Sequence, residues 1–204
     1  MESDSTSRYE DGGSDGRALE LLHLGEGRVL EFAVHGPDHG RVVLFHHGMP
    51  GSAVPMDSVL GSVTDRGYRV VTYSLAAVVR AGDPADLASG MASLLPEVDA
   101  AELTGAYGVD NAAHMNHGLA AGEDGWLGDL HALTTPWGFD PGDVTVPVDL
   151  WHGALDRMVP VAHGQWLARH VPTVRARVEG GHGHLSIGVG SLGDKLDRLR
   201  SRTS

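Results

Sequence analysis

The stretch that decides the fold runs from residue 144 to residue 186 and reads VTVPVDLWHGALDRMVPVAHGQWLARHVPTVRARVEGGHGHLS. Its first ten residues are an apolar run that predicts a buried strand, and residues 174–181 predict a second strand. Residues 162–172 between them have helical spacing and end at a proline, which favours a helix. Strand, helix and strand in this order predict a crossover unit of an α/β sheet.

Asp156 and His184 each follow one of these two strands. Because the carboxyl ends of parallel strands meet at the same edge of a sheet, we expect the two side chains to lie close together. A carboxylate in this place can accept a hydrogen bond from imidazole Nδ1–H, which turns Nε2 toward a hydroxyl group. The two residues therefore predict a carboxylate–imidazole pair.

Upstream, the sequence predicts a second crossover unit preceded by a hairpin. Residues 18–24 and 28–34 alternate in polarity around Gly-Glu-Gly, which indicates two half-buried antiparallel strands. The other expected elements are strands buried on both faces at 41–48 and 68–74, a helix at 55–67 that stops at Gly67, helical pattern at 83–95 and 97–119, and a terminal helix at 190–202.

The chain organisation expected from these patterns is a single domain. Residues 1–17 are rich in Ser, Asp and Gly, and we expect this tail to be disordered. Residues 18–204 are long enough for one domain with its own core, and residues 81–135 read as a helical, lid-like insert without strands. No internal repeat is visible.

Composition excludes several classes of function. The chain has no cysteine, which excludes disulfides, thiolate metal sites and a cysteine nucleophile. Its 27 acidic and 15 basic residues give a net charge of −12, which argues against a nucleic-acid partner. No apolar run approaches the ~20 residues of a membrane span, and the N-terminus has no signal-peptide pattern. We therefore expect a soluble, cytoplasmic protein that has no membrane partner.

Three motifs in order resemble the α/β-hydrolase family. Residues 136–172 with GGHGHLS resemble its C-terminal third, LFHHGMPGS (44–52) its oxyanion loop, and YRVVTYS (68–74) the strand after the first helix. The resemblance implies a mostly parallel sheet with an N-terminal antiparallel hairpin and a helical lid. It also implies a serine hydrolase for small esters or amides, with Asp156 as acid, His184 as base and the Met49 backbone N–H as an oxyanion donor. His182 is expected to be an exposed loop residue.

The family's nucleophile elbow, G-x-S-x-G, has no usable counterpart. GGSDG (12–16) lies in the polar tail, and GLAAG (118–122) places Ala120 where the serine would stand. After Ser74 the chain runs straight into LAAVV and helical pattern, as if the nucleophile segment were removed in frame. We therefore expect central strands to be absent and the protein to be inactive or severely impaired.

Other interpretations stay open. One is a hydrolase with an unorthodox nucleophile, such as Ser74, or with a water activated by His184. A second is a non-catalytic protein that binds a ligand or partner, and a third is a degenerate gene product of poor stability. A metal site made of His46, His47, His182 and His184 is disfavoured because no ligand spacing accompanies them. GMPGS lacks the glycines and lysine of a phosphate loop, so we expect no cofactor and no metal.

Overall fold

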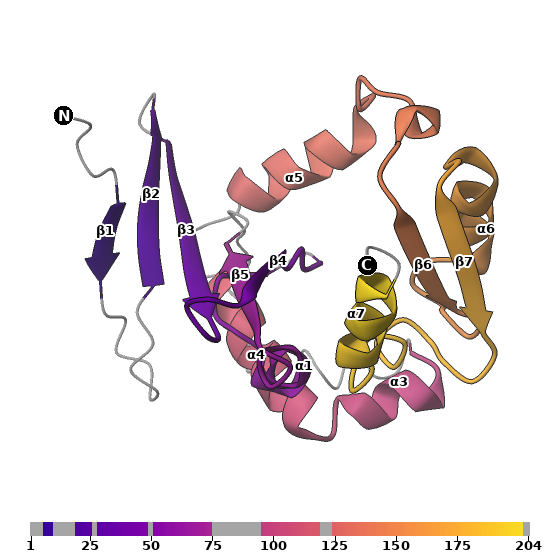
Figure 1. Cartoon of the computed structure of the whole chain (residues 1–204), viewed down its shortest axis with the longest axis horizontal. Helices are drawn as coiled ribbons and strands as arrows, with labels where there is room; N and C mark the ends of the chain where they lie inside the picture. Colours follow the sequence, from indigo (N-terminus) through magenta and orange to yellow (C-terminus); the bar gives the residue numbers. More distant parts are fainter. Residues whose placement is uncertain are drawn as a thin grey trace. The chain divides into compact units, whose positions relative to one another are not determined.

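The computed structural model describes residues 6–9, 19–25, 28–48, 51–74, 95–118 and 124–201. The chain divides into two compact units (Figure 1). The first comprises Met1–Ala81 and Asp110–Thr134, and the second comprises Gly82–Val109 and Thr135–Ser204. The sequence predicts a single domain from residue 18 onward, whereas the described strands form two separate sheets, one in each unit.

The first unit is built on a five-stranded sheet in the order β1-β2-β3-β5-β4. Its strands are β1 (Thr6–Tyr9), β2 (Leu19–Gly25), β3 (Arg28–His35), β4 (Arg41–Leu44) and β5 (Tyr68–Tyr73). All neighbouring strands are antiparallel except β4 and β5, which are parallel. The antiparallel hairpin expected at the N-terminal end is confirmed as β2 and β3.

Strand β1 corrects the expectation of a disordered tail at residues 6–9. Thr6 lies opposite Leu22 and Tyr9 opposite Leu19, so the backbone of β1 extends the β2–β3 hairpin. Backbone pairing carries no apolar signature, which is why a polar segment can form an edge strand without a sequence signal. The rest of the tail, residues 1–5 and 10–17, lies outside the described residues.

Helix α1 (Asp57–Thr64) joins β4 to β5 and confirms the upstream crossover unit. Val59, Leu60 and Val63 are buried on α1, and Val70 is buried on β5, where α1 packs. Gly67, with φ of 77°, adopts the left-handed conformation that ends the helix, as expected. The buried face of the sheet therefore lies under α1.

Strand β4 differs from the strand expected to be buried on both faces. It spans four residues, and Val42 and Leu44 are 64% and 51% exposed. Among the described strands, β4 pairs with β5 alone. An apolar run indicates that a strand is suited to burial on both faces, but its actual burial depends on the elements that pack against it.

The second unit carries a two-stranded parallel sheet of β6 (Val148–Gly153) and β7 (Val174–Glu179). Helix α6 (Val161–His170) connects them, as the spacing predicts. The described part of the unit also contains α3 (Glu97–Glu102), the short helix η1 (Pro141–Asp143) and α7 (Leu192–Arg200). Among the described strands, none links β4 of the first sheet to β6 or β7 of the second, and the expected loss of central strands stays a prediction because residues 75–94 lie outside the described residues.

The expected helical insert at 81–135 is described in part. Helix α3, helix α4 (Ala106–Gly118) and helix α5 (Asp124–Thr134) fall within it, and α4 crosses the boundary between the two units. Residues 81–94 and 119–123 lie outside the described residues. Every helix in the described part of the chain is too short or too polar to span a lipid bilayer.

Candidate active site

Asp156 lies in the turn that follows β6, and its carboxylate is held by the turn itself. Oδ1 accepts hydrogen bonds from the backbone N–H groups of Met158 at 2.9 Å and Val159 at 2.8 Å. The side chain is 5% exposed. The turn therefore fixes one carboxylate oxygen and leaves Oδ2 for another partner.

His184 lies in the loop that follows β7 and supplies that partner. Its Nδ1 lies 3.0 Å from Asp156 Oδ2, and its side chain is 36% exposed. The two side chains meet because β6 and β7 are in register up to Gly153 and Glu179. Beyond the strands, the N–H groups of Ala154 and Leu155 donate to the carbonyl oxygens of Glu179 and His182, both at 2.9 Å.

The surroundings of Asp156 favour its charged form. Burial disfavours the carboxylate, but hydrogen bonds from Val159 N–H, the His184 ring and Met158 N–H outweigh burial and hold the pKa of Asp156 below its ordinary value of 3.8. An ionised carboxylate beside Nδ1 favours the tautomer that carries the proton on Nδ1. His184 Nε2 is then the ring nitrogen able to accept a proton.

His152 and His182 flank this dyad without replacing its members. His152, on β6, lies with Nε2 2.9 Å from the Val159 carbonyl oxygen and 3.6 Å from Asp156 Oδ2. His182 lies with Nδ1 3.0 Å from the Ser186 carbonyl oxygen, and its side chain is 42% exposed. Sequence reasoning missed His152, although its place at the end of a buried strand was a usable signal.

A second residue that sequence reasoning missed is Asp99 on α3. It is fully buried, and its carboxylate accepts hydrogen bonds from His184, Leu185 and Ser186. Because its partners lie 85–87 residues away in the chain, no local pattern identifies it.

The hydroxyl groups of the serines described in the second unit form hydrogen bonds with groups other than the His184 ring. The hydroxyl of Ser186 donates to Asp99, that of Ser191 to the Ile187 carbonyl oxygen and that of Ser201 to the Arg198 carbonyl oxygen. No described serine of this unit forms a hydrogen bond with the His184 ring.

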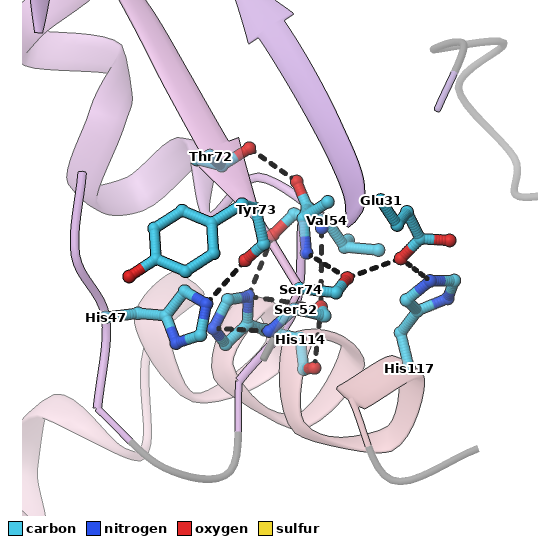
Figure 2. A network of polar contacts seen from close by, with 10 residues as sticks. Glu31, His47, Ser52, Val54, Thr72, Tyr73, Ser74, His114 and His117 are labelled. Carbon is cyan, nitrogen blue, oxygen red and sulfur yellow. Dashed lines mark hydrogen bonds and ion pairs between the residues drawn. The ribbon is translucent and has the colours of Figure 1, made fainter. Parts of the chain in front are cut away.

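In the first unit, Ser74 belongs to a polar network that braces the loop after β4 (Figure 2). Its hydroxyl donates to Glu31 Oε2 and accepts from the Ala53 backbone N–H at 2.8 Å. Glu31 Oε2 also lies 2.9 Å from His117 Nε2. A catalytic serine donates to an imidazole nitrogen, whereas the Ser74 hydroxyl donates to the carboxylate of Glu31 on β3 and accepts from the loop.

The same network contains a buried imidazole, His114 on α4, whose side chain lies beside the loop in Figure 2. Its Nδ1 lies 2.9 Å from the Val54 carbonyl oxygen, and its Nε2 accepts the Ser52 backbone N–H at 3.2 Å. Burial lowers the pKa of His114 to about 4, with smaller contributions from His47 and His117, while the bond to Val54 acts in the opposite direction. The ring is therefore neutral at neutral pH.

The proposed oxyanion donor Met49 lies outside the described residues, so its role stays a prediction. Of the neighbouring histidines, His46 Nδ1 lies 2.7 Å from the Tyr73 hydroxyl and His47 Nε2 lies 2.6 Å from the Tyr73 carbonyl oxygen. In the described part of the chain, no three His, Asp or Glu side chains are arranged to hold a metal ion.

No family model matches the chain. A curated relative, a non-heme chloroperoxidase of Streptomyces lividans, is 33% identical over 98 residues, which are 48% of this chain and 34% of that protein. The match thus spans about a third of that relative. A solved α/β-hydrolase fold protein of Nakamurella multipartita is 13% identical, with a TM-score of 0.60 over 96% of this chain and 98% of its own. A bromoperoxidase of Bacillus anthracis is 11% identical, with a TM-score of 0.54 over 98% of this chain and 100% of its own.

Proposed function

We propose that this chain, whose fold is that of the α/β-hydrolases, descends from a serine hydrolase acting on small esters or amides and retains the acid and base without the nucleophile. In this proposal Asp156 is the acid, His184 is the base and Met49 N–H is one oxyanion donor. The observation that carries it is the Asp156–His184 hydrogen bond of 3.0 Å, made in a unit whose described serine hydroxyls are all engaged elsewhere.

Strand pairing supports the loss of the nucleophile segment. In a nucleophile elbow the serine stands on a sharp turn between a strand and a helix. The described strands pair up to β4 in one sheet and form the separate β6–β7 pair in the other, and none of β2 to β7 is followed by a G-x-S-x-G sequence. The one match, GGSDG (12–16), follows β1 and lies outside the described residues. The second oxyanion donor is the N–H after the nucleophile, so it is lost with the elbow.

Magnitudes indicate what activity survives such a loss. In well studied serine proteases, removal of the nucleophile lowers turnover about 10⁶-fold. Substrate binding and the oxyanion hole still accelerate the reaction about 10³- to 10⁴-fold over the uncatalysed reaction in water. Here part of the oxyanion hole is lost as well. We therefore propose that the protein is inactive or severely impaired as a serine hydrolase of esters or amides.

A fluorophosphonate probe tests this proposal directly. We expect no covalent adduct on the full chain by intact-protein mass spectrometry, because no serine is activated by the His184 imidazole. The Ser74→Ala variant serves as the matched control and should give the same result. An adduct that maps to any serine would overturn the proposal, and loss of that adduct in Ser74→Ala would identify Ser74 as the nucleophile.

A second candidate function is hydrolysis of activated esters by a water molecule that His184 deprotonates. It is favoured by the exposed 36% of the His184 side chain, which leaves the dyad accessible to water. Under this second candidate, His184→Ala and Asp156→Asn each lower p-nitrophenyl acetate hydrolysis about tenfold, less than the ~10²- to 10⁴-fold contribution of a general base beside a positioned substrate.

The control for this second candidate is His182→Ala, which removes the neighbouring imidazole and leaves the dyad. Initial rates measured with enzyme in excess should be the same in His182→Ala as in the wild-type chain. Equal rates in His184→Ala and wild type would exclude water activation by the dyad.

A further inference from the structure

The carboxylate of Asp99 accepts every hydrogen bond described for the main-chain N–H groups at residues 184–186. Oδ2 accepts the His184 N–H at 2.6 Å. Oδ1 accepts the Leu185 N–H at 3.1 Å, the Ser186 N–H at 2.9 Å and the Ser186 hydroxyl at 2.7 Å. Three consecutive backbone donors and one hydroxyl thus converge on one side chain, and Asp99 is 0% exposed.

The loop is shaped to approach this carboxylate. A Cβ atom on Gly183 would lie 2.3 Å from Asp99 Oδ2, so a side chain at that position would push the carboxylate away. Gly183 N–H in turn donates to the Ser186 hydroxyl oxygen at 2.8 Å, which closes the loop on itself. Residues 183–186 therefore wrap the Asp99 carboxylate, and we call them the Asp99 loop.

We infer that Asp99 is a positioning residue that fixes the main chain of His184 and thereby the contact between the His184 ring and Asp156. The inference rests on the proposed function, because it assigns a role within the same dyad. The two carboxylates hold different parts of His184, since Asp156 binds the ring at Nδ1 and Asp99 binds the backbone N–H. Asp99 is not a catalytic residue, because the hydrogen bonds described for its carboxylate are all with the loop and none is with the imidazole.

Energetic considerations indicate that the conformation of the Asp99 loop depends strongly on the Asp99 carboxylate. Hydrogen bonds to a charged acceptor contribute more than those between neutral groups, and a buried donor left without a partner is costly. Removing the carboxylate leaves three backbone N–H groups and one hydroxyl without their acceptor. The loop must then rearrange to find others, and the His184 backbone moves with it.

Nuclear magnetic resonance of the histidine rings tests this inference without requiring any activity. In the full-length wild-type chain we expect His184 as the Nδ1–H tautomer, with an Nδ1 proton that exchanges slowly because it is bonded to Asp156. Asp99→Asn places an amide NH₂ among the loop donors, and we expect loss of this proton signal or exchange at least tenfold faster. A folded Asp99→Asn chain with an unchanged His184 signal would overturn the inference.

Two controls separate positioning from a general loss of stability. Glu102→Gln removes a carboxylate from the same helix, where Glu102 makes none of the four hydrogen bonds, and should leave the His184 signal as in wild type. Val171→Ala truncates a buried apolar residue of the same unit and should lower stability without changing the tautomer. An equal loss of the His184 signal in Val171→Ala would show that stability alone explains the effect, which would overturn the inference.

Ser186→Ala keeps the test decisive if Asp99→Asn does not fold. This change removes the hydroxyl that donates to Asp99 and that accepts the hydrogen bond of the Gly183 N–H. The three backbone N–H groups that donate to Asp99 remain. We expect the His184 Nδ1 proton to exchange several-fold faster than in wild type, and an unchanged rate would overturn the inference. This failure is distinguishable from failure of the proposed function, which would appear as a fluorophosphonate adduct whatever the His184 signal.

Discussion

The free energy of unfolding is expected to fall by about 3 kcal/mol between pH 6.5 and pH 4 because of one buried imidazole, that of His114. His114 is 3% exposed, and the two nitrogen atoms of its ring have different hydrogen-bond partners. Nδ1–H donates to the Val54 carbonyl oxygen, and Nε2 accepts the Ser52 N–H. A proton on Nε2 would face the Ser52 N–H, so the folded state holds the ring neutral.

The direction of the effect follows from the two pKa values. In the folded chain the pKa of His114 is lowered from 6.5 to about 4, whereas in the unfolded chain it keeps its ordinary value. As the pH falls through 6.5, the unfolded state therefore binds a proton that the folded state does not. Stability is lost across this window, and below about pH 4 both states are protonated and the loss is complete.

Urea unfolding at a series of pH values measures the free energy of unfolding of the wild-type chain and of the His114→Gln variant. At neutral pH we expect His114→Gln to be less stable than wild type, because the Ser52–His114–Val54 contacts are lost. The difference should shrink by about 3 kcal/mol by pH 4, since the variant has no imidazole to protonate. Replacing the exposed His39 with Gln should leave the wild-type pH dependence in place, and a constant difference between wild type and His114→Gln would contradict the prediction.

The dyad was predictable because its signals are local. An apolar run at β6 and an alternating run at β7 predict two strands, and Asp156 and His184 each follow one of them at the same sheet edge. The parallel register then brings the side chains to 3.0 Å. The order of the elements predicts that the two positions lie at one sheet edge, and the resemblance to the α/β-hydrolases implies which histidine pairs with Asp156.

The remaining contacts depend on residues far apart in the chain. Asp99 looks in sequence like an acidic residue in the first turn of a short helix, which is a favourable position for a charge in any protein. Nothing local shows that three N–H groups beyond residue 183 converge on it. Glu31 on β3, Ser74 just after β5 and His117 on α4 are likewise far apart in the chain, and their association requires the folded first unit.

The same limit explains the error on β4. Residues 41–48 were expected to be a strand buried on both faces because the run is continuously apolar. The strand spans only Arg41–Leu44, and Val42 and Leu44 are exposed, because its described pairing is with β5 alone. The residue pattern of a strand therefore predicts how much burial suits it, whereas the neighbouring elements in the fold determine how much of it is buried.

Gly153→Ala is expected to lower the free energy of unfolding of the second unit by about 3 kcal/mol. Gly153 ends β6, and a Cβ atom there would lie 2.3 Å from the Gly183 carbonyl oxygen and 2.4 Å from the His182 carbonyl oxygen. Both obstacles are backbone atoms, so no side chain can rotate away. The loop after β7 must move instead, and extra volume in a packed site costs about 1–3 kcal/mol, with rigid obstacles at the upper end.

That movement should also break the dyad, because Gly183 directly precedes His184. We expect the Gly153→Ala chain to lose the His184 Nδ1 proton signal even at temperatures at which the second unit is still folded. Gly180→Ala is the matched control: Gly180 lies between β7 and His184, and a Cβ atom there meets nothing within 4 Å. Its stability should stay within about 0.5 kcal/mol of wild type. Equal stabilities and equal His184 signals in the two variants would mean that the close approach of β6 to the His184 loop does not hold the dyad together.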